Sequence, residues 1–458
     1  MIINKLKKFG EKVCILNNNV TYRQITEYSQ HNYLILEKYC KNRIILLDIS
    51  LGWRMVPIIL GALMAKITIV PIDLIRTPYL EEKLFPDYLL ITSSNIDYKG
   101  KLITTFFEKS YYHNGDEELK NIAFIMFSSG TTGKPKGIKL TYENVFSNTE
   151  SILDYSNLNS EDRVLIIRPF TNISAITGEL LPSLLTGASI FIKDLRTSPL
   201  ACLETAFKYK INILFTTPSI ALKMLCFDKE SKLQSIKLLI LSGEQLTKGM
   251  YHKISAYNPK MQIWNAYGLS EASPRISIKK IEGYIFETGC IGRTLKGVKY
   301  KIINETGNWV NEGETGELWV CGPNIMDGYY LNKTLTQKKK FDGWLATGDL
   351  AYFKNGELFI KGRKDNMIIK YGMNIFPEEI EEAICSHPEV VNALVFTSYI
   401  NEQLNINAKV IKNVGSNLSA EEIHRYLILN YKDTRIRVDQ VMIDNQLEYT
   451  PSGKVLRK

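Results

Sequence analysis

Short apolar runs alternate with longer apolar or amphipathic segments through the first two-thirds of the chain, and this order restricts the fold more than any other feature. The hydrophobic pattern predicts a strand at 44–49, a helix at 54–65 and a second strand at 67–71. Further strand and helix segments follow at 163–168, 178–185, 211–216, 220–226 and 238–241. Strands that alternate with helices form parallel sheets whose faces the helices cover. We therefore expect an α/β protein built on helix-covered parallel sheets.

The pattern changes after Gly289. Short strands, predicted at 299–303, 316–321 and 357–360, are separated there by glycine-rich turns. Short strands of this kind predict a small antiparallel, barrel-like subdomain attached to the parallel sheets.

A second domain is expected at the C-terminal end. From Arg363 onward the pattern indicates a small α+β unit, with a helix at 377–386 whose first residues, a proline and acidic side chains, suit a helix N-terminus. Single hydrophobic cores stop growing near ~250–300 residues, and this chain has 458. We divide it at Gly362 to Asp365, into an N-terminal domain of residues 1–362 and a mobile C-terminal domain of residues 363–458.

Composition places the chain among ordinary globular proteins. Hydrophobic residues make up 45% of it and charged residues 23%, which excludes the disordered and fibrous classes. A formal charge of +9 suits an anionic partner such as a nucleotide, an acidic carrier protein or a nucleic acid, without choosing between them. Residues 1–12 lack the apolar stretch of a secretory signal, and no apolar run is long enough to span a bilayer. Seven scattered cysteines without a CxxC pair fit a reducing compartment, so we expect a cytoplasmic protein.

The segment 128–137, Ser-Ser-Gly-Thr-Thr-Gly-Lys-Pro-Lys-Gly, directly follows a strand predicted at 122–127. Glycines permit the positive φ angles that aim consecutive amide groups at one anion, while hydroxyl and ammonium groups add donors and positive charge. The segment is not the P-loop of the NTPases, because Lys134 is followed by Pro135 where that motif requires Ser or Thr. A solvated surface turn is the alternative, but the density of Ser, Thr, Gly and Lys directly after a strand favours a phosphate-binding loop.

Five further motifs follow this loop along the chain. They are Asn265-Ala266-Tyr267-Gly268-Leu269-Ser270-Glu271, Gly316-Glu317-Leu318, Thr347-Gly348-Asp349, Gly362-Arg363-Lys364-Asp365 and Pro451-Ser452-Gly453-Lys454. With the loop, and in this order, they resemble the adenylate-forming superfamily of acyl-CoA synthetases, nonribosomal peptide synthetase adenylation domains and beetle luciferases. The resemblance extends from about Thr21 to the C-terminus.

The resemblance implies an ATP-dependent ligase that joins a carboxylic acid to AMP, releases pyrophosphate, and passes the acyl group to a pantetheine thiol. Because a carboxylate must attack the α-phosphorus of ATP, two anions meet, and cations and donors must offset their repulsion. By resemblance, Lys454 bridges the carboxylate and the α-phosphate, and Glu271 holds the Mg²⁺ that accompanies ATP. Tyr267 is expected on the adenine face, and Asp349 at both ribose hydroxyls with Arg363 assisting.

The same resemblance extends the expected nucleotide site. Thr132 is expected to act in catalysis with Lys454 and Glu271. The other expected ATP contacts are Ser128, Ser129, Gly130, Thr131, Gly133, Lys134, Lys136, Gly243, Glu244, Asn265, Ala266, Gly268 and Ser270. The family usually has Thr where Ser270 stands, and Ser keeps the hydroxyl.

Adenylation and thioester formation place different demands on one site, because the lysine needed for the first step occupies space that the thiol needs in the second. The family resolves this by rotating the C-terminal domain. Asp365 stands at the hinge position, and hinge residues are few and lie in loops. The segment 370–375, with Gly372 in particular, is expected to meet the pantetheine thiol.

The acid pocket is expected on the helix that follows strand 163–168. Its candidate residues are Asn172, Ser174, Gly178, Thr217, Ala266 and Gly268. Ser174 stands where amino-acid-activating members carry an Asp, and a buried ammonium without a carboxylate partner is costly, so a typical α-amino acid is disfavoured. Asn172 stands where acyl-CoA synthetases often have His and aryl-acid-activating members often have Asn, which hints at an aryl or hydroxylated acid. Arg275 could meet an acidic group of the substrate or lie on the surface.

Several functions stay open at this point. The thiol acceptor is either CoA or the phosphopantetheine of a separate carrier protein, and a stand-alone adenylation enzyme that loads an amino or aryl acid is the alternative. A non-catalytic acyl- or nucleotide-binding homologue would have kept the fold, although the complete set Lys454, Glu271, Asp349 and Arg363 argues against it. A basic nucleic-acid-binding protein would show steeply salt-dependent binding.

Overall fold

The structure is a computed structural model. It describes residues 2–40, 44–75, 88–103, 119–128, 135–193, 198–283, 285–400, 403–413 and 415–444, with the backbone alone for Ser128. Residues 129–134 of the expected phosphate loop and Lys454 therefore lie outside the described residues.

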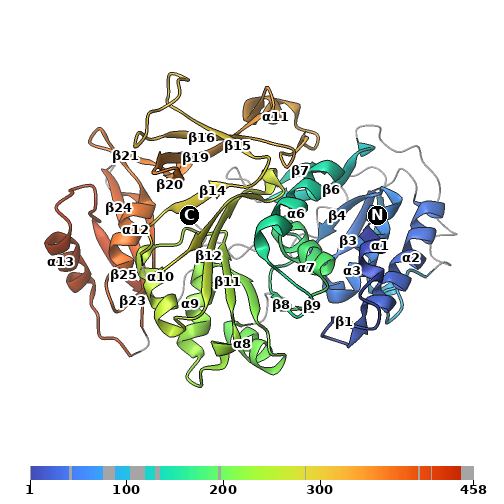
Figure 1. Cartoon of the computed structure of the whole chain (residues 1–458). Helices are drawn as coiled ribbons and strands as arrows, with labels where there is room; N and C mark the ends of the chain where they lie inside the picture. The colour runs from blue at the N-terminus through green and yellow to red at the C-terminus, as the bar shows by residue number, and fades with distance from the viewer. Residues whose placement is uncertain are drawn as a thin grey trace.

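A six-stranded sheet lies at the N-terminal end of the molecule (Figure 1), in the order β17-β7-β6-β4-β3-β5. Strands β3 and β4 are buried at every position and parallel, as expected for apolar strands covered on both faces. Helix α2 begins at a capping box formed by Thr21 and Gln24. The elements of this part are α1 (Ile2–Lys7), α2 (Tyr22–Tyr39), β3 (Ile44–Asp48), α3 (Met55–Ala65), β4 (Thr68–Ile72), β5 (Tyr88–Ile91), β6 (Ile122–Ser128), β7 (Lys136–Thr141) and β17 (Gly328–Tyr329).

A larger sheet of fourteen strands forms the middle of the molecule. Strands β9, β8, β10, β11 and β12 are parallel neighbours, and β13 turns the sheet antiparallel. The parallel part consists of β8 (Arg163–Ile166), β9 (Ser189–Ile192), β10 (Ile213–Thr216), β11 (Leu238–Ser242) and β12 (Gln262–Gly268), with β1 (Val13–Ile15) and β2 (Val20–Thr21) at its edge. The antiparallel part, which is the barrel-like region expected from the sequence, consists of β13 (Arg275–Ile281), β14 (Cys290–Thr294), β15 (Lys299–Ile303), β16 (Gly316–Cys321), β18 (Lys340–Phe341), β19 (Trp344–Lys354) and β20 (Glu357–Arg363).

Helices α6 and α7 lie between the two sheets (Figure 1) and share one hydrophobic core with strands of both. A second core lies under α8, α9 and α10, on the other face of the parallel strands. The helices are α6 (Tyr142–Ser156), the π-helical segment η4 (Ser174–Leu180), α7 (Leu181–Thr186), α8 (Pro199–Lys208), α9 (Pro218–Phe227), α10 (Lys248–Tyr257) and α11 (Lys333–Lys339).

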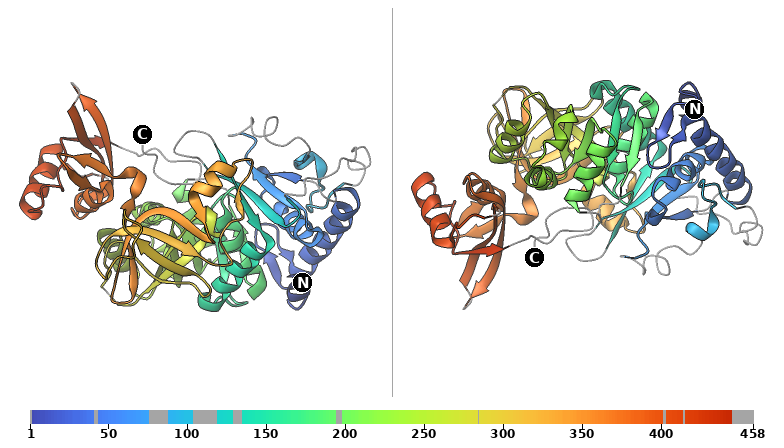
Figure 2. Two further views of the ribbon diagram at one scale, coloured as in Figure 1. Left: turned by 90° about the horizontal axis from the view of Figure 1, so that it is seen from above. Right: turned by 90° about the horizontal axis from the view of Figure 1, so that it is seen from below.

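The C-terminal residues form a separate lobe beside this body (Figure 2), with a hydrophobic core made only of residues from Ile368 onward. Its elements are η7 (Lys364–Asn366), β21 (Ile368–Lys370), β22 (Met373–Ile375), α12 (Pro377–Cys385), β23 (Val390–Ile400), β24 (Gln403–Lys412), α13 (Ala420–Asn430) and β25 (Gln440–Asp444).

The fold class predicted from the sequence is confirmed. Helix-covered parallel sheets, an antiparallel region and a small α+β lobe are all present. One helix differs, because the segment predicted at 178–185 is two elements, η4 and α7. The division at residues 362 and 363 stays a prediction.

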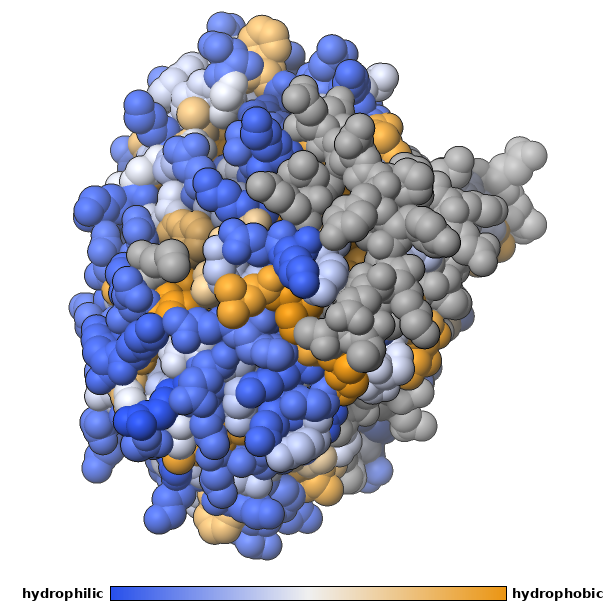
Figure 3. All heavy atoms as spheres, turned by 90° about the vertical axis from the view of Figure 1, so that its right-hand side faces the viewer, coloured by the Kyte–Doolittle hydropathy of each residue, from blue (hydrophilic) through white to orange (hydrophobic). Residues whose placement is uncertain are grey.

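Two surface features complete the description. The face in Figure 3 is mostly hydrophilic where residues are described, with apolar groups in separate patches. Among the described residues, no helix is both long enough and apolar enough to cross a membrane.

Candidate active site

The carboxyl ends of parallel strands β8, β10, β11 and β12 meet at one edge of the large sheet. Ligands of α/β proteins bind at this edge. It carries Thr217 directly after β10, Gly243 directly after β11, and Ala266 and Gly268 at the end of β12. Four of the expected pocket and nucleotide residues thus come from three neighbouring strands, and their contact with substrates stays a prediction.

Tyr267, Asp349 and Arg363 form a hydrogen-bonded group beside this edge. The Tyr267 hydroxyl donates to Asp349 Oδ2, and Arg363 Nη1 donates to Asp349 Oδ1 (3.1 Å) and to the Thr347 carbonyl (2.9 Å). Asp349 and Arg363 face each other in the β19–β20 ladder, and the Asp349 side chain is 6% exposed. Burial, with the charge of Asp349, raises the pKa of Tyr267 well above its ordinary value, so its hydroxyl stays a donor. The carboxylate is held rigidly, and its two oxygens keep acceptor capacity for a diol.

Glu271 lies in the short turn η6 (Ser270–Ala272) after β12. Its Oε1 accepts a hydrogen bond from the Tyr329 hydroxyl (3.0 Å), and its carbonyl accepts one from the Met326 amide (2.8 Å). Burial and the charge of Glu271 raise the pKa of Tyr329. No group of three or more His, Cys, Asp or Glu side chains that could hold a metal occurs in the described ranges. A single oriented carboxylate fits Mg²⁺ that takes its other ligands from phosphates and water.

The expected phosphate loop connects β6 to β7, which form an antiparallel hairpin with Ser128 opposite Lys136. Strand β17 pairs with β7, so that Tyr329 lies opposite Ile138. Since the Tyr329 hydroxyl also donates to Glu271, strand β17 connects the β6–β7 hairpin to the turn that carries the Glu271 carboxylate. The described residues therefore bring the two ends of the loop, Lys136 and Glu271 into one region, while 129–134 lie outside them.

Two expected ATP contacts make structural hydrogen bonds. Asn265 Nδ2 donates to the Cys290 carbonyl (2.8 Å). Glu244 is half-buried, and its Oε2 accepts bonds from the amide (3.2 Å) and the hydroxyl (2.6 Å) of Ser219. Burial raises the pKa of Glu244. Contact of either residue with ATP stays a prediction.

The expected acid pocket is bounded by η4. Asn172 Oδ1 accepts a bond from the Ser174 amide (3.0 Å), which fixes the start of this segment, and Thr177 Oγ1 donates to the Ser273 carbonyl (2.7 Å). Ser174 is buried, as is Gly178. The segment is thus tied to Ser273 in the turn that carries Glu271, and the Asn172 side chain bonds its first residue, a contact that the motif position did not reveal.

A buried ion pair lies behind this pocket, and sequence analysis missed it. Arg168 Nε is 3.3 Å from Glu179 Oε1, and Arg168 Nη2 donates to the carbonyls of Thr216 and Ser242 (both 2.9 Å), at the ends of β10 and β11. Burial raises the pKa of Glu179 to about 7, opposed by Arg168 and Arg275. A lone acidic residue inside the apolar run Ser-Ala-Ile-Thr-Gly-Glu-Leu-Leu was the sequence signal that could have predicted this pair.

The expected hinge and thiol-step residues lie in the C-terminal part. Asp365 is the middle residue of η7, with Oδ2 3.7 Å from Arg363 Nη2. Tyr371 (φ +53°) and Gly372 (φ +75°) form the two-residue turn of the β21–β22 hairpin, and positive φ at both positions is the hairpin turn in which glycine is favoured. Tyr371 is 87% exposed. Their roles in rotation and thiol transfer stay predictions.

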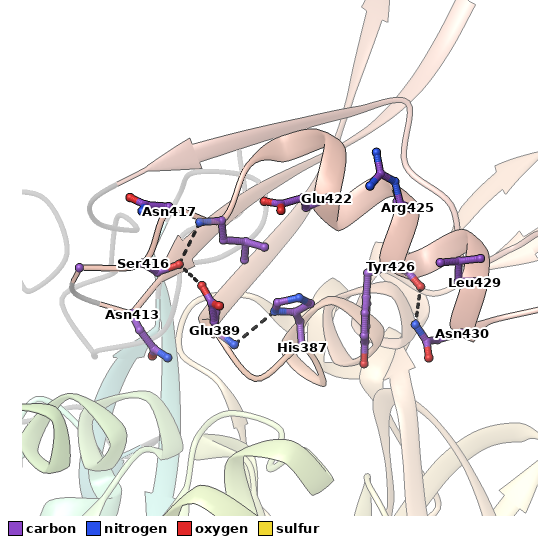
Figure 4. A pocket seen from close by; sticks show the side chains of 12 residues that line it. His387, Glu389, Asn413, Ser416, Asn417, Glu422, Arg425, Tyr426, Leu429 and Asn430 are labelled. Carbon is purple, nitrogen blue, oxygen red and sulfur yellow. Dashed lines mark hydrogen bonds between the residues drawn. The ribbon is translucent and has the colours of Figure 1, made fainter.

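A hollow on the C-terminal lobe is separate from this site. Figure 4 shows His387 and Glu389 on one side of it and Arg425 and Tyr426 of α13 on the other. None of the expected site residues lines it.

The chain is similar to known proteins both in sequence and in fold. The sequence model of the AMP-binding enzyme family matches residues 90–330, more than half of the chain. The chain therefore belongs to the AMP-binding enzyme family.

Among curated relatives, a 4-coumarate–CoA ligase of Humulus lupulus is 30% identical over 356 residues, which cover 74% of this chain and 64% of that protein. A 4-coumarate–CoA ligase of Arabidopsis thaliana is 28% identical over 354 residues, covering 74% of this chain and 62% of that protein. The chain thus spans less than two-thirds of the length of these relatives.

Solved structures share the fold. ATP-bound MatB from Rhodopseudomonas palustris is 19% identical with a TM-score of 0.81, covering 99% of this chain and 97% of MatB. O-succinylbenzoate coenzyme A synthetase (MenE) from Bacillus subtilis, with ATP and magnesium, is 22% identical with a TM-score of 0.78, covering 100% and 98%. The two-domain fold of these proteins is the fold of this chain.

Proposed function

We propose that this protein is an ATP-dependent acid–thiol ligase, which forms an acyl-adenylate with release of pyrophosphate and then transfers the acyl group to CoA. The observation that carries the proposal is the Tyr267–Asp349–Arg363 group at the carboxyl edge of the large sheet, with Glu271 held by Tyr329. The curated relatives are named as CoA ligases, which supports CoA over a carrier protein as the acceptor.

Each group of this chain has a distinct task in the proposed reaction. Asp349, held by Tyr267 and Arg363, accepts hydrogen bonds from the ribose hydroxyls and orients the nucleotide. Glu271 would hold Mg²⁺, which, when bound, spreads the charge of the triphosphate. The loop at 128–137 provides amide, hydroxyl and ammonium donors to the phosphates. Lys454 then offsets the negative charge that the carboxylate brings to the α-phosphorus.

The reaction is tested by pyrophosphate release from ATP with aliphatic, aryl and amino acids, each with and without CoA. We expect release with at least one acid class and formation of an acyl-CoA thioester when CoA is present. An acyl-adenylate that CoA does not consume would favour a carrier-protein phosphopantetheine as acceptor. No release with any acid would favour a non-catalytic nucleotide-binding role.

Replacement of Lys454 tests whether its positive charge stabilises the transition state of the adenylation step. Lys454→Ala should lower the rate of pyrophosphate release by at least ~10²-fold, the scale for losing one group that stabilises transition-state charge. Transfer to CoA from supplied acyl-adenylate should stay near the wild-type rate. The control is Lys458→Ala, which removes a lysine of the same C-terminal segment and should change neither step. Equal loss of both steps in Lys454→Ala would contradict the assigned role.

A further inference from the structure

Arg275 is a buried cation that pairs with no carboxylate within 4.0 Å among the described residues. The residue is 2% exposed, and no ion pair within 4.0 Å reaches it in the part of the chain that the structure describes. Its Nη2 has no hydrogen-bond partner there. Sequence analysis left open whether this arginine lies on the surface, and its burial excludes that alternative.

The backbone of Arg275 is fixed on both sides, so its burial follows from its position in the sheet. Its amide donates to Asn148 Oδ1 (3.1 Å), and its carbonyl accepts from Asn148 Nδ2 (2.8 Å) and Asn324 Nδ2 (3.1 Å). It begins β13 and lies opposite Gly268. A guanidinium that starts from this anchored position is held next to the end of β12, where the acid and the nucleotide are expected.

Two carboxylates lie nearby, and the charge of Arg275 helps to lower the pKa of one of them, Glu179. Glu179 pairs with Arg168 at 3.3 Å, and Glu244 binds Ser219 through the amide and the hydroxyl. An unpaired charge inside a protein costs several kcal/mol unless a partner is supplied. Neither carboxylate lies within 4.0 Å of the Arg275 guanidinium, so its Nη2 is left without an acceptor in the part of the chain that the structure describes.

Glycine leaves room beside each of the two guanidinium groups. A Cβ atom on Gly178 would lie 3.4 Å from Arg275 Nη2, and one on Gly243 would lie 4.0 Å from Arg168 Nη1. Gly178 is an expected acid-pocket residue, and Gly243 is an expected nucleotide contact. The unpaired nitrogen of Arg275 thus lies beside an expected acid-pocket residue that has no side-chain carbon of its own.

We propose that Arg275 binds a second carboxylate of the acid substrate, so that the substrate class is a dicarboxylic acid activated at the carboxyl group distant from Arg275. The proposal rests on the proposed function. A guanidinium matches a carboxylate in shape and charge and binds it through paired, charge-assisted hydrogen bonds. Arg275 is then a specificity-determining residue, and the pocket discriminates against acids with an apolar end because they leave its charge unpaired.

The experiment compares pairs of acids of equal shape, in which a distant carboxylate is replaced by an isopropyl group. The pairs are adipate with 6-methylheptanoate and terephthalate with 4-isopropylbenzoate, within a wider panel of diacids and monoacids of graded length. The readout is kcat/KM for pyrophosphate release. We expect the best diacid to exceed its isopropyl counterpart by about 10- to 100-fold, the range for a hydrogen bond to a charged group.

Three variants test whether the preference for the diacid depends on Arg275. Arg275→Met should lower kcat/KM for the diacid by about 10- to 100-fold and leave the isopropyl counterpart unchanged or improved. Gly178→Ala keeps the guanidinium but narrows the space beside it, and should raise KM for the diacid more than for the counterpart. Arg293→Met removes an exposed arginine of β14 and should change neither. Thermal melting of each variant checks that the fold is intact, and Gly178→Ala keeps the test valid if Arg275→Met fails to fold.

The outcomes distinguish a failure of the role of Arg275 from a failure of the proposed ligase activity. Turnover of monoacids without preference for any diacid, or equal loss of both members of a pair in Arg275→Met, would overturn the role of Arg275 while the ligase activity stands. Absence of pyrophosphate release with every acid would instead reject the ligase activity. The proposal is supported if the diacid preference is reversed in Arg275→Met and is unchanged in Arg293→Met.

Discussion

Several charged side chains of this protein are buried. The hydrogen bonds and charges around each of them determine how it behaves. Asp349 receives a hydrogen bond on each oxygen, from Tyr267 and from Arg363, which fixes the orientation of its carboxyl group. Glu179, also buried, has Arg168 at 3.3 Å, yet burial still raises its pKa to about 7. Desolvation outweighs attraction at this second carboxylate, and this leads to a measurable effect of pH.

Glu179→Gln should gain stability relative to the wild type as pH rises. Between the ordinary pKa of 4.5 and the raised value of about 7, folded Glu179 keeps a proton that the unfolded chain has lost. The free energy of unfolding of the wild type therefore falls as pH rises through this window, by up to ~3 kcal/mol. Glutamine does not titrate, so the free energy of unfolding of Glu179→Gln does not fall for this reason. Melting temperatures of both proteins from pH 4.5 to 8 measure the effect.

The matched control for this change is Glu161→Gln, which alters a side chain that is 88% exposed. Its melting temperature should follow that of the wild type at every pH. Parallel curves for Glu179→Gln and the wild type would show that Glu179 titrates normally and that Arg168 offsets its burial in full.

At the scale of elements, the turn after β12 depends on one close backbone approach. The Leu269 amide donates to the Pro274 carbonyl (2.9 Å), and a Cβ atom on Gly268 would lie 1.9 Å from that carbonyl oxygen. The loop between them carries Glu271. Only glycine lets the end of β12 and the start of β13 pair this closely.

Gly268→Ala should therefore force these two strand ends apart and displace Glu271 and Tyr267. We expect kcat/KM for ATP to fall by at least ~10²-fold, comparable to misplacing a catalytic group by about 1 Å, and the free energy of unfolding to fall by ~1–3 kcal/mol. Pyrophosphate release and thermal melting measure the two effects. Gly307→Ala is the control for the kinetics, because nothing lies within 4 Å of its Cβ position. Its φ of +83° strains an alanine, so this variant should melt at a lower temperature but leave ATP use unchanged. Wild-type kinetics in Gly268→Ala would contradict the close-approach argument.

The whole molecule consists of a large body and a C-terminal lobe that touch through polar contacts. Asn392 Nδ2 donates to Ser219 Oγ (3.2 Å), and Lys361 pairs with Glu379 at 3.4 Å. The lobe has a hydrophobic core of its own. Polar interfaces between domains permit relative motion, which the proposed two-step reaction requires.

Asp365→Pro should separate the two half-reactions. Proline fixes φ near −65°, so the lobe should be restricted to one of the two orientations that the reaction needs. We expect one half-reaction to stay near the wild-type rate and the other to fall by at least ~10²-fold, measured as pyrophosphate release and as acyl transfer to CoA from supplied acyl-adenylate. Asp365→Ala removes the same carboxylate without restricting φ and should affect the two steps much less. Equal loss of both steps in Asp365→Pro would reject the hinge.

The sequence by itself determined part of the helices and strands of the large body, the glycine-rich turns and the positions of the nucleotide motifs. These depend on local periodicity and on backbone conformations that few residues tolerate. Strands 44–49, 67–71 and 238–241 lie within a residue or two of β3, β4 and β11 for this reason.

Only the tertiary structure decided which distant groups meet. The pairing of Tyr267 with Asp349 spans 82 residues and that of Tyr329 with Glu271 spans 58, and neither leaves a periodic trace in the sequence. The burial of Arg275 and the pairing of Arg168 with Glu179 likewise depend on how η4 packs beside β8 and the start of β13. Burial sets the energy of a charge, and burial is a property of the packed molecule, because it depends on all the neighbours that exclude water.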